Sequence, residues 1–297
     1  MGNRFAISVV SADERYAMYC IGQAIAEIQR IEKLLTTFNE ESQTQLINRY
    51  AGIQPVEVDD EVIRLIERSI KISELTQGAF DITYGSIDKR FWNFDTNMTS
   101  LPSAESAEKS VRLINYKNIQ IDKTNNTVFL KEKGMRIGFG GIGKGYAADR
   151  AKIILQQLGI ESGVVNAAGD LITWGTQPNG DNWTIGIANP DAQEQLCSEL
   201  VISNKAVATS GNYEKFAVIE GKKYSHTIDP KTGFPVSGIK SVTVICPSAE
   251  LADAMATPVM VMGIEAGLYL INQLNGIECI IIDDSNKIYV SDHIKIR

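Results

Sequence analysis

The segment "SELVISNKAVATS", residues 198–210, decides the class of fold because two strand-like stretches follow one another here without an intervening helix. Both stretches are short and contain β-branched residues, which is typical of strands. Similar stretches recur through the C-terminal half of the chain, at residues 162–167, 183–188, 215–220, 241–246, 278–283 and 287–291. Only two stretches with helical character, residues 249–262 and 264–274, interrupt them. Strands that cluster in this way predict an α+β fold rather than a doubly wound sheet.

The N-terminal half contributes most of the predicted helices. Between Asp13 and Thr37 apolar residues recur every three or four positions, which predicts an amphipathic helix. A second helix is predicted from Asp59, its expected cap, to Leu75. Shorter elements are expected as strands at residues 4–10, 118–122, 127–132 and 135–139 and as helices at residues 107–114 and 144–158. No internal repeat or linker divides the chain, so we expect one continuous domain over residues 1–297.

The overall composition restricts the partners and the metals. The chain carries a net charge of −7 and no block of Lys and Arg, which argues against a nucleic-acid partner. No apolar run approaches the roughly 18 residues of a membrane helix. There are two histidines, and the four cysteines lie far apart among apolar neighbours, at positions Cys20, Cys197, Cys246 and Cys279. Such cysteines are expected to be buried, so a bound metal would be a hard, oxygen-liganded ion such as magnesium or calcium.

The segment "GFGGIGKGYAADRA", from Gly138 to Ala151, nearly matches a phosphate-binding loop. Gly145 stands where that motif needs Ser or Thr to hold magnesium, which argues against a nucleotide triphosphatase. Closely spaced glycines before a helix, followed by the charge of Lys144, are still suited to holding an anion. The alternative is a tight turn that only connects a strand to a helix.

The segment "ELADAMATP", from Glu250 to Pro258, places Asp253 and Thr257 four residues apart. On a helix these two side chains lie on one face, and their oxygens suit a magnesium ion that also keeps waters or substrate phosphates. Pro258 predicts that Thr257 lies at a kink or caps the next helix. The alternative is a solvated aspartate and a capping threonine.

The segment "YSHTIDPKTGFP", residues 224–235, holds His226 in a tight polar turn, where Asp229 could orient its ring. Taken alone, this segment favours a histidine that only rests in a surface turn. An anion cradle, a pair of oxygen ligands and one histidine are together the parts that metal-assisted phosphoryl chemistry requires. The residues therefore indicate pyrophosphate chemistry and leave the substrate open.

Several motifs of the chain resemble those of the ApbE-like flavin transferases, the FAD:protein FMN transferases. They occur in the order and spacing of that family: "MGNRF" (1–5), "TQGAFDIT" (76–83), "GGIGKGYAAD" (140–149), "NAAGD" (166–170), "ATSGNY" (208–213), "SHTIDPKTGFP" (225–235) and "ADAMAT" (252–257). The resemblance covers nearly the whole chain. It implies a single-domain α+β fold of the thymidylate-tunnel type, with clustered antiparallel strands and flanking helices.

The resemblance also implies an activity and partners. It implies magnesium-dependent cleavage of FAD, attachment of FMN through its phosphate to a threonine of a partner redox protein, and release of AMP. A membrane-bound redox subunit is one candidate for this acceptor. Members usually follow a secretory or lipoprotein leader, so the resemblance implies an extracytoplasmic protein if a leader was removed and a cytoplasmic one if the chain is leaderless.

Individual roles carry over by position. His226 matches the residue cast as the base, Asp253 and Thr257 match metal ligands, and Gly141 matches a position whose carbonyl binds the same ion. Lys144 and Gly138 match positions that hold the dinucleotide. Positions that border the flavin nucleotide are matched by Met1, Phe38, Ala79, Phe80, Asp81 and Ile228.

Three residues depart from the family pattern at positions that are expected to affect the binding of FAD. Asn3 stands where Thr is usual, Gly138 stands where many relatives have Asp, and Phe38 replaces a frequent Tyr. Two other functions stay open: a magnesium-dependent FAD pyrophosphatase that gives FMN and AMP, and a non-enzymatic FAD carrier.

Overall fold

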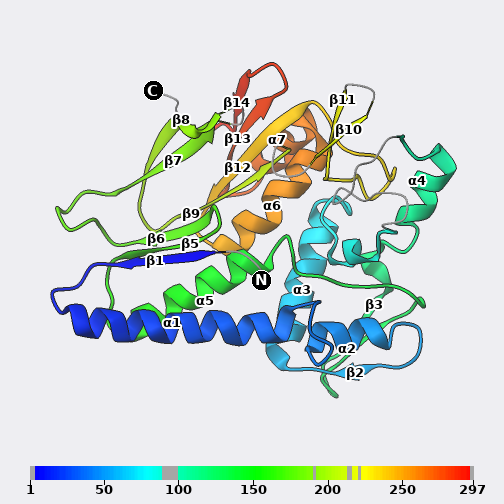
Figure 1. Ribbon diagram of the computed structural model, residues 1–297, viewed down its shortest axis with the longest axis horizontal. Coiled ribbons are helices and arrows are strands. Elements are labelled where there is room, and N and C mark those ends of the chain that lie inside the picture. The colour runs from blue at the N-terminus through cyan, green and yellow to red at the C-terminus, as the bar shows by residue number, and fades with distance from the viewer. Residues whose placement is uncertain (1–3, 89–99, 190–191, 213–215, 220–221, 295–297) are drawn as a thin grey trace.

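A seven-stranded antiparallel sheet forms the centre of the protein (Figure 1). The computed structural model describes residues 4–88, 100–189, 192–212, 216–219 and 222–294. The strands follow one another across the sheet in the order β1 (Phe5–Val9), β5 (Gly163–Ala167), β6 (Asp170–Trp174), β9 (Ala206–Gly211), β12 (Ile239–Cys246), β13 (Glu278–Asp283) and β14 (Ile288–Val290). Every pairing is antiparallel. The first and last strands in sequence are therefore opposite edges of one sheet, and the predicted α+β class with antiparallel strands is confirmed.

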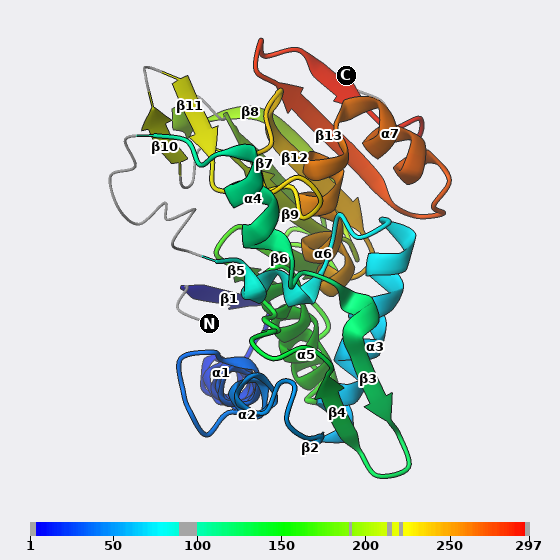
Figure 2. The same ribbon diagram turned by 90° about the vertical axis from the view of Figure 1, so that its right-hand side faces the viewer.

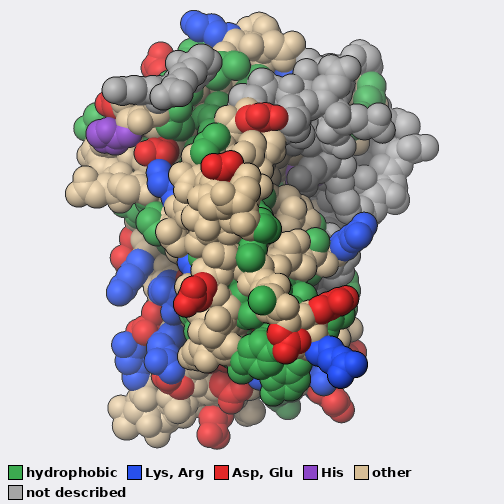
Figure 3. All heavy atoms as spheres, turned by 90° about the vertical axis from the view of Figure 1, so that its left-hand side faces the viewer, with side chains coloured by type: hydrophobic (Ala, Val, Ile, Leu, Met, Phe, Trp, Pro, Cys, Tyr) green, Lys and Arg blue, Asp and Glu red, His purple; other side chains and the backbone are tan. Residues whose placement is uncertain are grey.

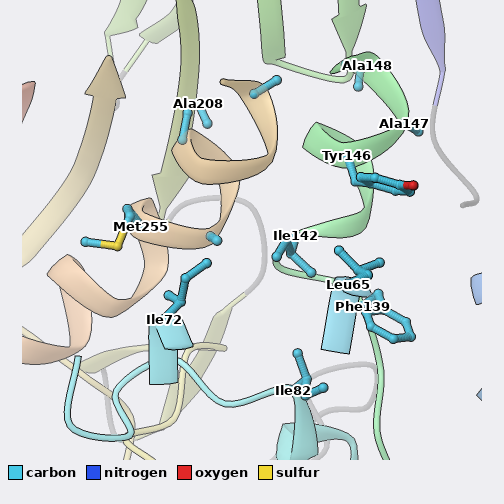
Figure 4. Close-up of a cluster of buried hydrophobic side chains, with 14 of the residues drawn as sticks. Leu65, Ile72, Ile82, Phe139, Ile142, Tyr146, Ala147, Ala148, Ala208 and Met255 are labelled. Atoms are coloured by element: carbon cyan, nitrogen blue, oxygen red, sulfur yellow. The ribbon is translucent and has the colours of Figure 1, made fainter. Parts of the chain in front are cut away.

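Helices cover one face of this sheet. They are α5 (Gly143–Gln157), α6 (Ala249–Met262) and α7 (Ile264–Asn272), and α1 (Glu14–Leu35) packs against α5. Figure 4 shows Ala147 and Ala148 of α5, Met255 of α6 and Ala208 of β9 in the resulting core. The two helices α5 and α6 approach so closely that a Cβ added at Gly145 would lie 2.0 Å from a carbonyl oxygen of α6. Small residues at this crossing fix the spacing of the two helices.

The opposite face of the sheet packs against a long hairpin, β7 (Trp183–Asn189) and β8 (Ala192–Ile202). Ile187 and Ile202 of the hairpin form an apolar cluster with side chains of four central strands, Leu171, Val207, Ile245 and Ile280. The sheet is thus buried on both faces, which agrees with the nearly continuous apolar sequence of its central strands. On the side of the molecule shown in Figure 3, basic and acidic side chains lie interspersed.

The remaining elements form a second layer beside the helices (Figures 1 and 2). In chain order they are α2 (Gln43–Arg49), β2 (Val56–Glu57), α3 (Asp60–Leu75), the 3-10 helix η1 (Ile82–Ser86), α4 (Ala104–Val111), the 3-10 helix η2 (Tyr116–Asn118), β3 (Ile119–Asp122) and β4 (Thr127–Leu130). Strands β2, β4 and β3 make a small sheet. A two-stranded hairpin, β10 (Phe216–Ile219) and β11 (Lys222–Ser225), leads into the turn that holds His226.

The longer helices form where the spacing of apolar residues predicts them. In α1 the buried positions recur at Cys20, Ala24, Ile28, Ile31 and Leu35. Asp13 caps this helix by accepting a hydrogen bond from the Tyr16 N–H at 3.0 Å. Asp59 occupies the expected cap position of α3, although its side chain makes no capping hydrogen bond.

One predicted strand, residues 135–139, is wrong. Its backbone pairs with none of the described strands: side chains bind Arg136 and Ile137, and the Gly138 N–H donates to the Ile82 carbonyl of η1 at 2.8 Å. Asn48 donates to the Ile137 carbonyl at 2.9 Å and accepts from the Ile137 N–H at 2.7 Å. Ser86 accepts from the Arg136 N–H at 2.8 Å. The sequence pattern alone does not show this difference, because a segment whose backbone is bound by side chains can have the same composition as a strand.

Two further predictions concern the cysteines and membrane-spanning helices. Cys20, Cys246 and Cys279 are buried free thiols, as predicted, whereas the side chain of Cys197 lies outside the described part of the chain. Across the described residues, no helix combines the length and the apolar character needed to cross a bilayer.

Candidate functional site

A cavity of about 380 Å³ lies where five separate segments of the chain meet. This is within the usual range for small-molecule sites of about 300–1,000 Å³. The predicted site residues that line it are Ala79, Phe80, Asp81, Gly138, Gly141, His226, Ile228 and Thr257. Residues from four separate motifs are therefore brought to one cavity, which we call the main cavity.

A second cavity of about 200 Å³ adjoins the first and shares Gly138 and Gly140 with it. Phe38 and Lys144 line this smaller cavity. The Phe38 ring is 98% exposed, so it offers an open aromatic face beside the glycine turn. Met1, the remaining predicted flavin-bordering residue, lies outside the described residues, as does Asn3.

A larger groove of about 610 Å³ lies elsewhere, between α3, α5 and the start of α6. Two of its carboxylates are held in ion pairs: Glu250 pairs with Arg68, which also lines the groove, at 2.5 Å, and Glu61 pairs with Arg30 of α1 at 2.7 Å. Of the predicted site residues that the structure describes, none lines this groove. Because chemistry and not volume decides a site, we place the candidate site at the two smaller cavities.

The Lys144 ammonium forms an ion pair with Asp170, the first residue of β6. The side chain of Asp170 is 4% exposed and that of Lys144 is 24% exposed. Burial raises the pKa of the Asp170 carboxyl, and the charge of Lys144 partly opposes this. Sequence reasoning missed Asp170 as a site residue, although it ends the motif at residues 166–170. A carboxylate at the start of an apolar strand was the available signal.

We expect Lys144→Ala to lower the melting temperature of the protein without ligand. The substitution leaves the buried Asp170 carboxylate without its cation, and breaking a buried pair costs about 3 kcal/mol at the low end of the usual range. Adding Asp170→Asn to the same chain should restore most of the loss, because the uncompensated charge is gone. Thermal unfolding followed by circular dichroism measures both effects, and a Lys144→Ala variant that melts like wild type would contradict the expectation.

Asp253 and Thr257 lie on one continuous helix. The expectation that Thr257 caps a following helix is wrong, since α6 runs through Pro258 to Met262, whereas the expected kink at Thr257 stays a prediction. Asp253 is 7% exposed, and its Oδ2 accepts a hydrogen bond from the Gly145 N–H at 3.0 Å. Burial, with the nearby charge of Asp170, raises the pKa of Asp253 to about 7. One turn later the Thr257 hydroxyl donates to the Ser210 hydroxyl at 3.4 Å.

The oxygens at this point have the chemistry of a magnesium site. Asp253 supplies a buried carboxylate that lines neither cavity, whereas Thr257, one turn further along α6, and Gly141 line the main cavity. Among the described residues, no three His, Cys, Asp or Glu side chains group as a metal site. A set of one carboxylate, one hydroxyl and one carbonyl fits magnesium, which usually keeps waters or substrate phosphates as its other ligands. The residues present therefore fit the ion that the resemblance implies.

Asp149 of α5 fixes the start of α6. Its carboxylate accepts from the Ser248 hydroxyl at 2.7 Å and from the N–H groups of Ala249 and Glu250, each at 3.0 Å. Four N–H groups at a helix start lack partners within the helix, and this carboxylate satisfies two of them. Together with the tight crossing at Gly145, this cap holds Asp253 at a set distance from the glycine turn. Asp149 was also missed, although it ends the motif at residues 140–149.

His226 stands at the entrance of a compact turn, and its half-buried side chain lines the main cavity. The Asp229 carboxylate accepts from the Lys231 N–H at 2.8 Å and from the Thr232 hydroxyl at 3.2 Å, so these hydrogen bonds organise the turn, and a role for Asp229 in orienting the ring stays a prediction. Gly233 has φ of +72°, and a Cβ there would lie 2.1 Å from the Ala107 carbonyl oxygen. The turn is therefore packed directly on α4.

Asp81 lines the main cavity, but its carboxylate is engaged by its own segment. It accepts from the Thr83 N–H at 2.8 Å, from the Thr83 hydroxyl at 2.7 Å and from the Tyr116 N–H at 2.8 Å. Burial raises its pKa. Asp81 thus shapes the wall that Ala79 and Phe80 present to the cavity. Ser210 and Tyr84 also line this cavity and were missed, the first within a quoted motif and the second one residue beyond another.

Comparison with known proteins gives one consistent family. The model of the ApbE family matches residues 1–281. A FAD:protein FMN transferase of Klebsiella pneumoniae (strain 342) is 32% identical over 100% of this chain and 91% of its own length. The solved ApbE protein of Thermotoga maritima has a TM-score of 0.88 at 32% identity and covers 98% of this chain and 94% of its own. The apo form of the Pseudomonas stutzeri flavinyl transferase ApbE has a TM-score of 0.85 at 28% identity, with 98% and 92% covered.

Proposed function

Because the chain belongs to the ApbE family, we propose that it is a FAD:protein FMN transferase that uses Mg²⁺ to cleave FAD. FMN would be attached through its phosphate to a threonine of a partner redox protein, with a membrane-bound redox subunit as one candidate, and AMP would leave. The main cavity is the observation that carries this proposal, since it joins His226, Thr257 and the glycine turn in one place. Lys144 and Phe38 extend the same site through the adjoining cavity.

Different residues would bind the flavin nucleotide and the pyrophosphate of FAD. The flavin nucleotide would lie against Ala79, Phe80 and Ile228, with the exposed Phe38 ring available for stacking. The pyrophosphate would lie at the glycine turn, where α5 begins and where Lys144 supplies a positive charge. Asp253, Thr257 and the Gly141 carbonyl would hold Mg²⁺, which offsets negative charge on the phosphate oxygens when bound.

His226 has the chemistry needed for the transfer step. A threonine hydroxyl attacks phosphorus poorly until a base accepts its proton, and imidazole titrates near neutral pH. His226 would accept that proton as the threonine oxygen bonds to the FMN phosphorus. The bond between this phosphorus and the bridging oxygen then breaks, and AMP departs with the bonding electrons.

One experiment distinguishes a flavin transferase from a FAD pyrophosphatase and from a non-enzymatic FAD carrier. The protein is incubated with FAD, MgCl₂ and a candidate acceptor protein, and the products are weighed by mass spectrometry. An acceptor heavier by FMN supports transfer, and its target Thr→Ala variant should stay unmodified. Free FMN and AMP without a modified acceptor would indicate a pyrophosphatase, and unchanged FAD would indicate a carrier.

We expect Phe38→Ala to raise the dissociation constant for FAD about tenfold. Stacking on an aromatic ring contributes about 1–3 kcal/mol per ring, and the 98% exposure of Phe38 means that the substitution costs no burial. Titration of FAD followed by its fluorescence measures the change, and the melting temperature should stay constant. Tyr269→Ala is the matched control, since this ring is 73% exposed and lines neither cavity. If the two variants bind FAD with equal affinity, Phe38 does not stack on the flavin.

A further inference from the structure

Tyr84 connects the flavin-bordering segment to the turn that holds His226. It lies in η1, three residues after Asp81, and its side chain reaches a turn that is more than 140 residues further along the chain. The Tyr84 hydroxyl accepts a hydrogen bond from the Ile228 N–H at 3.1 Å and donates to the His226 carbonyl at 3.5 Å. One hydroxyl thus binds the backbone on both sides of Thr227.

The surroundings of Tyr84 make these two contacts important. Ile228 is 1% exposed, so its N–H is removed from water. The Tyr84 ring packs in a small apolar cluster with Val111 of α4, Ile228 and Phe234. Burial raises the pKa of Tyr84 to about 12, and the hydroxyl therefore keeps its proton at neutral pH. A phenol has one proton to donate, and here it is directed at the backbone and not at the cavity.

We propose that Tyr84 is a positioning residue for His226. By fixing the backbone from His226 to Ile228, it sets where the imidazole stands relative to the wall formed by Ala79 and Phe80. Errors of about 1 Å in the placement of a reacting group can cost roughly a hundredfold in rate. The inference rests on the proposed role of His226 as the base.

The chain offers a direct readout of this role, because it contains two histidines in total. In proton NMR of the protein without an affinity tag, the imidazole C–H signals are those of His226 and the exposed His293. His226→Ala identifies which signals belong to His226. In Tyr84→Phe we expect the His226 signals to shift or broaden beyond their wild-type linewidth while the His293 signals stay in place.

A matched control is available at Tyr16. Its hydroxyl also donates to a backbone carbonyl, that of Leu158 at 2.7 Å, but at the outer surface of α1. Tyr16→Phe should leave both histidine spectra and the transfer rate unchanged. Circular dichroism should show Tyr84→Phe to be folded at the assay temperature.

Kinetics complete the test. We expect Tyr84→Phe to lower kcat for FMN transfer about 10- to 100-fold, with a smaller change in KM for FAD. In a His226→Ala background the same substitution should have almost no further effect on kcat, because Tyr84 acts through the base that is already absent. A Tyr84→Phe protein with unshifted His226 signals, or with kcat within twofold of wild type, would overturn the proposal, as would an undiminished effect in the His226→Ala background. Normal transfer by His226→Ala would instead remove the base assignment in the proposed function, and the NMR comparison would still decide whether Tyr84 places this ring.

Discussion

Asp253→Asn should abolish magnesium-dependent cleavage of FAD and leave the protein folded. An ion that offsets charge on the phosphate oxygens contributes several kcal/mol, so loss of its only carboxylate ligand should lower the rate about a thousandfold. The fold should tolerate the change. Burial raises the pKa of Asp253 to about 7, so ionisation between its unfolded value of about 3.8 and pH 7 costs stability, and a neutral amide avoids that cost. The Asn side-chain oxygen can still accept from the Gly145 N–H.

Rates of AMP release measured with and without a chelator test this expectation. Thr257→Val is the graded comparison, and its effect should be milder because water can replace a neutral hydroxyl. The melting temperature of Asp253→Asn at pH 8 should equal or exceed that of wild type. A variant that cleaves FAD at an unchanged rate, or a wild type indifferent to chelation, would remove Asp253 from the metal site.

His226→Ala should bind FAD normally and transfer FMN about a hundred to ten thousand times more slowly, the usual contribution of a general base. The loss should fall on kcat, because the imidazole acts on the incoming hydroxyl rather than on FAD. His293→Ala is the matched control, since this second histidine is exposed near the C-terminus and lines neither cavity.

Single-turnover measurements with saturating FAD separate the transfer step from binding. If His226→Ala transfers FMN within a few-fold of wild type, the proton must go elsewhere, and His226 is then a residue of the turn that happens to line the cavity. A parallel loss of FAD affinity would instead assign the ring to ligand binding.

The sequence predicts the long helices and most central strands because their apolar spacing reflects burial. The apolar period of α1 and the cap at Asp13 are local signals. Strand β6 was missed because all five of its residues, including Asp170 and Trp174, are buried, so it shows no alternation. The seven residues of α2 are too few to establish a helical period.

The candidate site, like the fold, was predictable from the sequence only in part. Motifs resembling those of a known family name Asp253, Thr257 and His226, and the fold brings Thr257 and His226 to the main cavity, with Asp253 one turn before Thr257 on α6. The partners of these residues were not predictable, because each contact joins separate segments. Lys144 meets Asp170 from 26 positions away, and Tyr84 meets Ile228 from 144 positions away. No pattern in one sequence specifies such pairs, since they depend on how the sheet brings its connections together.

The cap that Asp149 places on α6 has a consequence for the order in which the protein is made. Its partners Ala249 and Glu250 are 100 and 101 positions further along the chain. A ribosome that has released α5 has therefore not yet synthesised the helix that carries Asp253 and Thr257. Contacts of such sequence separation form late in folding and slow it. Translation that stops before residue 257 yields a product with the glycine turn and Lys144 but without Thr257, and such a fragment lacks a complete set of magnesium ligands.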